Sequence, residues 1–516
     1  MRAAVTRILA AVDLHEHIVL FGDYDVDGVT SLALLDEMLR AYGATPQLFL
    51  PLRMEEGYGL SQESVERCLE QYRPQLLVAL DCGTAATGKI RELKKRGVDV
   101  IVLDHHEAKS VVPDCVAVVN PKTDLESPFH YLCSVGIVFK LCHALLKTRP
   151  LPGFDLKSKL DLVALGTVAD VVPLTGLNRA FVAKGLIALR RRERPGHVSL
   201  MDVARLSGPP EAWHLGFLLG PRINAGGRIG RADLGVRLLL ENDPIEAAKI
   251  AAELDRLNRE RQAIEQETLA QAEAEADAAL GVEDQGAVIV TAAEGWHPGI
   301  VGLVAARLKE KFGRPAFAIA LEPGGIGTGS GRSIPGVDIG RAVRRAVAEG
   351  LLVKGGGHAM AAGATLRRGA LAELRAYLET TLAPDVEKAR RASGLLIDGA
   401  VTAAAADGVL LAMISRAGPF GSGNPEPIIA LPAHTITYAE EVGQAHMRVR
   451  LKSGDGAAVN AIAFRAVGQK LGIALRNSRG RQVHAAGCFA LDRWQGEERV
   501  QFKLTDVAPA EPFTGA

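Results

Sequence analysis

IVLFGDYDVDG (residues 18–28) joins a short apolar run to three aspartates at alternate positions, Asp23, Asp25 and Asp27. Such a short, uniformly apolar run is typical of a strand buried in a parallel sheet. Alternate residues of an extended segment point the same way, so we expect the three carboxylates to gather on one side. A calcium loop is the rival interpretation, but the later Glu and the flanking helix pair of an EF-hand are missing.

Three further clusters of acidic and imidazole side chains follow apolar segments of the chain. VALDCG places Asp81 after a second expected strand. VIVLDHH places Asp104, His105 and His106 after a third, and Asp170 interrupts the apolar stretch GTVADVVPL. Alone, an Asp at a strand end is often a turn residue or a helix N-cap, and paired histidines are more often structural. Four such clusters in one chain are difficult to explain in that way.

The positions of these clusters predict a metal site. Ligands of an open parallel sheet bind at the carboxyl ends of its strands, and three of the clusters are expected there. Carboxylates packed closely together repel one another, so a cation should hold them. Carboxylates and imidazoles without a thiolate favour manganese or magnesium over structural zinc. Two such ions, about 3.5–4 Å apart, would suit phosphodiester hydrolysis.

The length of 516 residues and the changing sequence pattern predict an α/β protein of several units. Short β-branched runs alternate with helical periods in the first part, and a second α/β pattern starts near residue 285. Short strands with turn residues after about residue 395 predict a small β-barrel. We therefore expect a parallel-sheet domain with a helical extension, a long connecting helix, a second α/β domain and a barrel, at residues 1–240, 241–283, 284–388 and 394–510.

Composition limits the environment and the partners. The 60 basic and 60 acidic residues balance, so nucleic acid would have to bind to local patches. The six cysteines show no C-x-x-C pair, which indicates neither a zinc site nor a disulfide framework and fits a reducing cytoplasm. No stretch resembles a signal peptide or reaches membrane-spanning length, so we expect a soluble, untargeted protein.

In order along the chain, DYDVDG, LDCG, DHH and GTVADVVPL resemble the successive motifs of the DHH phosphoesterases. EEGYGL, NPKTD, GPRINAGGR, GSGRSI, GGGHAMAAG and GPFGSGNPEP extend the resemblance to the bacterial RecJ family over nearly the whole chain. It implies a DHH domain, a DHH-associated α/β domain and a C-terminal OB-fold. It also implies a 5′-to-3′ exonuclease, specific for single-stranded DNA, that releases mononucleotides with two Mn²⁺ or Mg²⁺ ions in DNA repair and recombination.

The resemblance further implies roles for individual residues. The metal ligands would be Asp25, Asp27, Asp81, His105 and Asp170, with Asp23 as a further candidate. Asp104 and His106 complete the expected catalytic set, and His106 would contact the scissile phosphate or a metal. The 5′ phosphate and the DNA would be bound by Arg53, Tyr58, Arg222, Ser330, Arg332, Gly356 and His358. Ser134 stands where the family more often has glycine, and we expect no catalytic consequence from it.

Two alternative functions stay open. A DHH-type phosphodiesterase for oligonucleotides or cyclic dinucleotides would use the same clusters but would lack the terminal barrel. A non-catalytic single-strand-binding scaffold would keep the fold but lose metal ligands. The expected partners are single-stranded DNA, a single-strand-binding protein and a repair helicase, and we expect a monomer. Arg448, Arg450 and Lys452 alternate along one expected strand of the barrel and would line its DNA groove.

Overall fold

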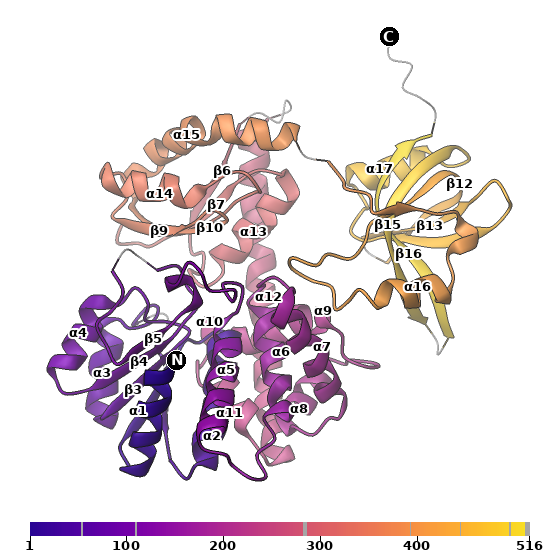
Figure 1. Ribbon diagram of the computed structural model, residues 1–516. Helices are drawn as coiled ribbons and strands as arrows, with labels where there is room; N and C mark the ends of the chain where they lie inside the picture. The colour runs from indigo at the N-terminus through magenta and orange to yellow at the C-terminus, as the bar shows by residue number, and fades with distance from the viewer. Residues whose placement is uncertain are drawn as a thin grey trace.

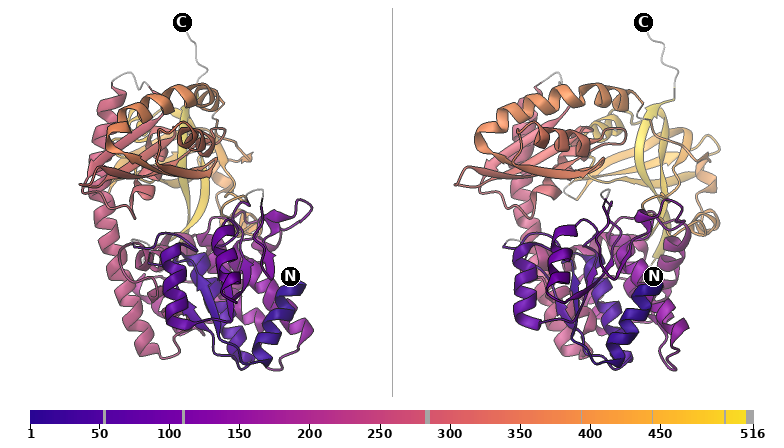
Figure 2. Two further views of the ribbon diagram at one scale, coloured as in Figure 1. Left: turned by 90° about the vertical axis from the view of Figure 1, so that its left-hand side faces the viewer. Right: turned by 60° about the vertical axis from the view of Figure 1, so that its left-hand side comes forward.

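The computed structural model describes residues 1–510 except 53–54, 109–110, 282–285, 393, 444 and 495–496. It contains two α/β units and a β-barrel, and helix α12 (Pro244–Leu280) runs along one side of both α/β units (Figures 1 and 2). The expected fold class is therefore confirmed. The barrel lies beside the two α/β units, on the side of the helices α6 (Leu160–Ala169) and α7 (Gly176–Arg190) (Figure 1).

The first α/β unit is built on a five-stranded parallel sheet in the order β2-β1-β3-β4-β5. The strands are β1 (Ile18–Gly22), β2 (Gln47–Phe49), β3 (Leu76–Leu80), β4 (Asp99–Leu103) and β5 (Ala117–Val119). After β1 the chain adds β2 on one side and then returns to place β3 on the other side. The carboxyl ends of β1 and β3 thus flank a topological switch point, the place where sheets of this kind bind ligands.

Helices cover both faces of this sheet. Within β1, Ile18 and Leu20 enter the core on one face, whereas Val19 and Phe21 enter the core on the other. This alternation explains why the strand is apolar at every position. The first face carries α1 (Arg2–Asp13), α2 (Val26–Ala41) and α5 (Ser134–Thr148), and the second carries α3 (Gln62–Tyr72) and α4 (Thr87–Lys95).

A helical part follows the sheet and contains α6 and α7, then α8 (Pro195–Val203), α9 (Ala212–His214), α10 (Gly220–Ile229) and α11 (Leu234–Leu240). The glycine-rich stretch 220–231 has a composition typical of a break between helices, yet most of it forms α10. Packing explains the difference: a Cβ atom at Gly227 would lie 3.0 Å from Cβ of Tyr24. The glycines allow close approach of the helix to the first unit, which outweighs their low helix propensity.

Helix α12 has 37 residues and is therefore about 55 Å long. Its first half contributes Ala251 and Leu254 to the core of the first unit, and its second half contributes Ala272 and Ala276 to a core of the second unit. The helix is thus part of both hydrophobic cores.

The second α/β unit has a mixed sheet in the order β6-β7-β8-β10-β9. Its elements are β6 (Ile289–Glu294), α13 (Val301–Phe312), β7 (Ala316–Leu321), β8 (Ile326–Arg332), α14 (Ile339–Ala348), β9 (Lys354–His358), β10 (Ala361–Arg367) and α15 (Leu371–Arg391). The triple glycine at 355–357 has a composition typical of a loop. It instead forms most of β9, an edge strand paired antiparallel with β10.

The C-terminal unit is a closed barrel with one added strand. Its strands are β11 (Gly399–Ala400), β12 (Ile429–Val442), β13 (His446–Lys452), β14 (Ala458–Ala463), β15 (Gln482–Trp494) and β16 (Glu497–Pro509), and β12 pairs with β15 to close it. The helices are α16 (Gly408–Ser415) and α17 (Lys470–Asn477). Arg448, Arg450 and Lys452 are exposed on β13, as their alternation predicts, while the residues between them are buried.

Within the described part of the chain, no helix combines the length and the apolar character needed to cross a membrane. The six cysteines are all free, and five of them are buried.

Candidate metal centre

Acidic and imidazole side chains from distant parts of the first unit converge into one cluster. Their potential ligand atoms form three groups, and within each group all the atoms lie within 4.8 Å of one another. The groups are Asp23–Asp25–Asp81, Asp81–His105–His106 and Asp27–His105–Asp170. Asp81 and His105 each belong to two groups, so the three groups are continuous.

The sheet topology brings these residues together. Asp23 follows β1, Asp81 follows β3 and Asp104 follows β4, so all three lie at the carboxyl edge of the sheet near its switch point. Asp81 has a φ of 62°, in the left-handed region that non-glycine residues rarely adopt. Its backbone N–H donates to the carbonyl of Leu103 at 2.9 Å, which helps to hold this conformation. Backbone strain of this kind is concentrated at functional sites.

The local conformation of two clusters differs from the sequence-based expectation. Asp25 is not part of an extended segment: it is the N-cap of α2, and its carboxylate accepts a hydrogen bond from the N–H of Gly28 at 3.0 Å. Asp27 lies in the first turn of that helix and joins a different group from Asp23 and Asp25. Asp170 lies at the C-cap of α6 rather than after a strand.

Burial and mutual repulsion raise the pKa values of three carboxyls. Desolvation and then the charge of Asp25 raise the pKa of Asp27 to about 7. Desolvation and the charges of neighbouring aspartates, Asp25 and Asp27 among them, raise the pKa of Asp81 and of Asp170 well above the usual range. The C-terminal end of α6 also carries partial negative charge next to Asp170. Without a cation, these groups cannot all be ionised at neutral pH.

Two unsatisfied atoms show where a cation fits. Among the described residues, neither Nε2 of His105 nor Oδ2 of Asp170 has a hydrogen-bond partner, although both atoms are buried. They lie 3.5 Å apart, and Nε2 lies 3.3 Å from Oδ1 of Asp81. Desolvation, followed by the charge of His106, lowers the pKa of His105 to about 3. Its imidazole is therefore neutral, the form that binds metals, and the donor set of oxygen and imidazole nitrogen suits Mn²⁺ or Mg²⁺.

The N-terminus of α5 holds two of the carboxylates, a contact that no sequence pattern predicts. The N–H groups of Ser134 and Val135 donate to the two carboxylate oxygens of Asp27 at 2.6 and 2.9 Å. The hydroxyl of Ser134 donates to Oδ1 of Asp81 at 2.8 Å. Ser134 therefore contacts two expected ligands, although we expected no catalytic consequence from this residue.

Asp104 orients His106 and belongs to none of the three groups. Its carboxylate accepts hydrogen bonds from Nδ1 of His106 at 2.7 Å and from the N–H of Thr84 at 2.9 Å. Burial opposes ionisation of Asp104, but the hydrogen bond and the charge of His106 lower its pKa below the usual range. Burial likewise lowers the pKa of His106, but the hydrogen bond and charge of Asp104 outweigh it, so the net shift is upward. Asn120, which the sequence did not single out, donates to the carbonyl of His106 at 2.8 Å.

Tyr58 is the expected DNA-contacting residue that lies in contact with the cluster. Its hydroxyl donates to the backbone carbonyl of Asp81 at 3.1 Å and lies 3.1 Å from Nε2 of His106. The residue is 51% exposed, so part of it can contact a bound molecule. Arg53 lies outside the described residues.

Residues of the second unit approach the same cluster. Arg332 and Ser330 lie on β8, where Nη1 of Arg332 donates to Oγ of Ser330 at 2.8 Å. His358 ends the edge strand β9, and its pKa is lowered by desolvation and then by the charges of His106, Lys122 and Arg332. Gly356 has open space where a side chain would be. His358 of the second unit therefore lies within electrostatic reach of His106 in the first unit and of Arg332 in its own.

Arg222 is engaged in a different contact. Its Nε donates to Asp255 of α12 at 2.9 Å and its Nη1 donates to the carbonyl of Leu218 at 2.6 Å. A bound phosphate would have to share this guanidinium with Asp255.

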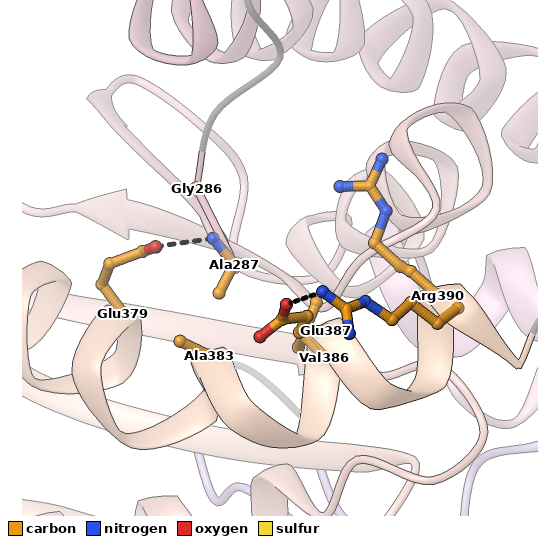
Figure 3. Close-up of a pocket in the computed structure, with 8 residues that line it drawn as sticks. Gly286, Ala287, Glu379, Ala383, Val386, Glu387 and Arg390 are labelled. Atoms are coloured by element: carbon orange, nitrogen blue, oxygen red, sulfur yellow. Dashed lines mark hydrogen bonds and ion pairs between the residues drawn. The ribbon is translucent and has the colours of Figure 1, made fainter.

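A pocket of about 460 Å³ lies elsewhere, between α15 and the start of β6 (Figure 3). Its lining includes Glu379, Glu387 and Arg390, and none of the expected site residues. Glu379 accepts a hydrogen bond from the N–H of Ala287 at 2.6 Å, as Figure 3 shows. This pocket is therefore separate from the acidic cluster.

Comparisons with known proteins agree with this arrangement. Three family models match: the N-terminal domain of the DHH family at residues 17–167, the DHHA1 domain at 285–383 and the RecJ OB domain at 397–506. A single-stranded-DNA-specific exonuclease RecJ from Dickeya dadantii is 34% identical, over 98% of this chain and 90% of the relative. The RecJ of Bacillus subtilis is also 34% identical over 99% of this chain, which spans 64% of that relative.

Solved structures show the same likeness. RecJ from Thermus thermophilus in complex with Mn²⁺ superimposes with a TM-score of 0.80 at 30% identity, over 100% of this chain and 72% of that one. An exonuclease RecJ bound to manganese gives a TM-score of 0.64 at 35% identity, over 75% of this chain and 96% of that one.

The parallel sheet, the aspartate–histidine cluster and the second α/β unit define a protein of the DHH class. The C-terminal OB barrel and identity along nearly the whole chain narrow this class further. The chain belongs to the RecJ family of single-stranded-DNA-specific exonucleases.

Proposed function

We propose that this protein is a single-stranded-DNA-specific 5′-to-3′ exonuclease that releases mononucleotides and acts in DNA repair and recombination. The observation that carries the proposal is the continuous cluster of Asp23, Asp25, Asp81, His105 and Asp170 at the edge of the sheet. The relatives that align with nearly the whole chain are RecJ exonucleases.

Two divalent ions, Mn²⁺ or Mg²⁺, would be held by this cluster. The proposed ligands are Asp25, Asp27, Asp81, His105 and Asp170, with Asp23 as a further one. When bound, such ions polarise the phosphoryl group and acidify water. They also offset the repulsion that raises the pKa values of the buried carboxyls.

His106 and Asp104 would act on the scissile phosphate as a pair. Asp104 is ionised and holds Nδ1 of His106 at 2.7 Å. The imidazolium would place positive charge beside the phosphate oxygens as their negative charge increases. Tyr58, whose hydroxyl is tied to the backbone of Asp81, would offer its ring to the terminal base.

The polarity of cleavage would come from recognition of the 5′ phosphate. Arg332 and Ser330 on β8 supply a guanidinium and a hydroxyl, and an Arg fork matches phosphate oxygens. Arg222 would share its charge between the phosphate and Asp255, and Arg53 would add a further cation. The bare backbone around Gly356 allows close approach of the strand, and His358 would contact it.

The barrel would bind the part of the single-stranded DNA that lies beyond its 5′ end. Arg448, Arg450 and Tyr438 line a surface pocket of about 460 Å³ on the barrel, which can accept backbone phosphates and a base. The DNA would pass through a channel between the two α/β units that is too narrow for paired strands, so duplex DNA would be excluded. A single-strand-binding protein, a repair helicase, a monomeric state and a cytoplasmic location remain predictions.

The test is digestion of a single-stranded oligonucleotide labelled at the 5′ or the 3′ end, in Mn²⁺, with Asp81→Ala as the inactive control. We expect stepwise loss from the 5′ end, no cleavage of a blunt duplex and no cleavage by the variant. Cleavage of dinucleotides alone would instead indicate an oligonucleotide phosphodiesterase. Tight binding without turnover would indicate a scaffold.

A further inference from the structure

The segment GPFGSGNPEP lies between α16 and β12 of the barrel unit, and the proposed function assigns it no role. Residues 416–424, which include the first seven residues of this segment, are here called the docking loop. In Figure 1 this orange segment leaves the barrel and reaches the helical part of the first unit. It therefore connects the barrel with the unit that carries the metal centre.

One side chain gives the docking loop its shape. Nδ2 of Asn424 donates to the carbonyls of Ala417 at 3.1 Å and of Pro419 at 3.0 Å. The backbones of Gly421 and Asn424 also pair, with hydrogen bonds of 2.9 and 3.2 Å. These bonds close the loop on itself, so it presents a fixed surface.

The docking loop is bound tightly to residues 173–179 of the first unit. The N–H of Leu174 donates to the carbonyl of Ser422 at 2.7 Å. Nε and Nη2 of Arg179 donate to the carbonyl of Gly418 at 3.1 and 3.0 Å. The approach is so close that a Cβ atom on Gly423 would lie 2.7 Å from Pro173. A Cβ atom on Gly421 would likewise lie 2.8 Å from Cδ1 of Leu174, so glycine at these two positions allows the contact.

The segment that the docking loop contacts begins at a proposed metal ligand. Asp170 lies three residues before Pro173, and Val171 between them has a φ of 61°, so this turn is a strained one. Such a turn keeps its shape only when its surroundings hold it. The contacts of the docking loop with Pro173 and Leu174 provide that hold.

The same segment is connected to the N-terminus of α5. Nδ2 of Asn178 donates to the carbonyl of Pro173 at 3.0 Å and to the carbonyl of Tyr131 at 2.6 Å. The N–H of Leu177 donates to the hydroxyl of Tyr131 at 3.1 Å. Tyr131 lies three residues before Ser134, whose N–H holds Asp27. The contacts thus continue from the docking loop to Asp170 and to Asp27, two carboxylates of the same ligand group.

We propose that the docking loop is a positioning element of the metal centre: by holding residues 173–179 it places Asp170 and, through Tyr131, the α5 N-terminus that binds Asp27. The inference rests on the proposed function, because it concerns the same metal ions. Its consequence is that the barrel affects metal affinity in addition to binding DNA.

The test compares Asn424→Ala, which opens the docking loop, with Arg179→Ala, which removes its main contact on the other unit. Asn477→Ala, an exposed position at the end of α17 in the barrel, is the matched control. Mn²⁺ affinity is measured by calorimetry on the full-length, metal-stripped proteins, and circular dichroism checks folding. Single-strand affinity is measured separately in a metal chelator.

We expect both variants to bind Mn²⁺ about tenfold more weakly, as when residues that orient metal ligands are removed, while their single-strand affinity and that of Asn477→Ala stay unchanged. Saturating Mn²⁺ should restore kcat without a change in KM for DNA. The loss of Mn²⁺ binding free energy in the double variant should be smaller than the sum of the two single losses, because both substitutions act through one loop.

Two results would overturn the inference. If the unsubstituted protein binds Mn²⁺ and both variants bind it equally well, the docking loop does not position the metal centre, and the proposed function is untouched. If the unsubstituted protein itself binds no Mn²⁺, the proposed function fails and the inference fails with it.

Discussion

In the absence of divalent ions, the free energy of unfolding of the first α/β unit should fall as pH rises. In the folded protein the pKa of Asp27 is raised from 3.8 to about 7, first by desolvation and then by the charge of Asp25. A carboxyl with a raised pKa binds its proton more tightly when folded. Its contribution to stability is therefore complete below the unfolded pKa and is lost as pH rises through the folded pKa.

The magnitude follows from the shift. One pKa unit corresponds to about 1.4 kcal/mol, so a shift from 3.8 to about 7 amounts to about 4 kcal/mol over the full titration. About 2 kcal/mol of this is lost between about pH 5.5 and about pH 8. Mn²⁺ at about 100 times its dissociation constant would add about 2.7 kcal/mol to the free energy of unfolding. It binds best at a pH where the carboxyls are ionised. We therefore expect stabilisation by metal at pH 8 and much less at pH 5.5.

The assay is differential scanning calorimetry in a chelator and in Mn²⁺ across this pH range. Because the protein has several units, it is not expected to unfold in a single two-state transition. The transition to follow is therefore the one that Asp27→Asn alters. That variant should show a weaker pH dependence than the unsubstituted protein in the chelator. If the metal-free protein instead became more stable between pH 5.5 and 8, or if Asp27→Asn left the slope unchanged, the reasoning would be refuted.

Three further outcomes can be checked by kinetics. Ser134→Ala removes the hydroxyl that donates to Asp81, so the Mn²⁺ concentration for half-maximal activity should rise about tenfold, and an unchanged value would contradict this role. Arg332→Ala should reduce the preference for 5′-phosphorylated over 5′-hydroxyl ends, measured as the ratio of kcat/KM, with Arg367→Ala, at an exposed position at the end of β10, as a control. Tyr58→Phe keeps the ring and should change KM little, whereas Tyr58→Ala should cost about 1–3 kcal/mol of base stacking. Equal effects of these two substitutions would argue against stacking.

The sequence predicted the sheet and the convergence of the acidic clusters well, for a physical reason. Strands buried on both faces are apolar throughout, and parallel topology brings the residues that follow β1, β3 and β4 to one edge. The ordered motifs then indicated the second α/β unit and the barrel. Convergence of Asp23, Asp81 and His105 depended on this global pattern rather than on local conformation.

Local conformation was predicted less well, because tertiary packing decides it. Alternation suggested an extended path through Asp25 and Asp27, yet Asp25 caps α2 and Asp27 lies in the first turn of that helix. Glycine content suggested loops at 220–231 and 355–357, yet close packing makes the first mostly helical and sheet pairing makes the second an edge strand. The residues that hold the carboxylates come from unrelated segments, so no spacing in the sequence could link Ser134 to Asp81.

The account depends most on the binding of divalent ions by the aspartate–histidine cluster. Crystals soaked in Mn²⁺ and measured at the manganese absorption edge test this directly. The account predicts two anomalous peaks, both within the cluster that includes Asp27, Asp81, His105 and Asp170. Anomalous peaks found only outside the cluster would contradict the account. So would the absence of any peak in crystals where solvent can reach the cluster.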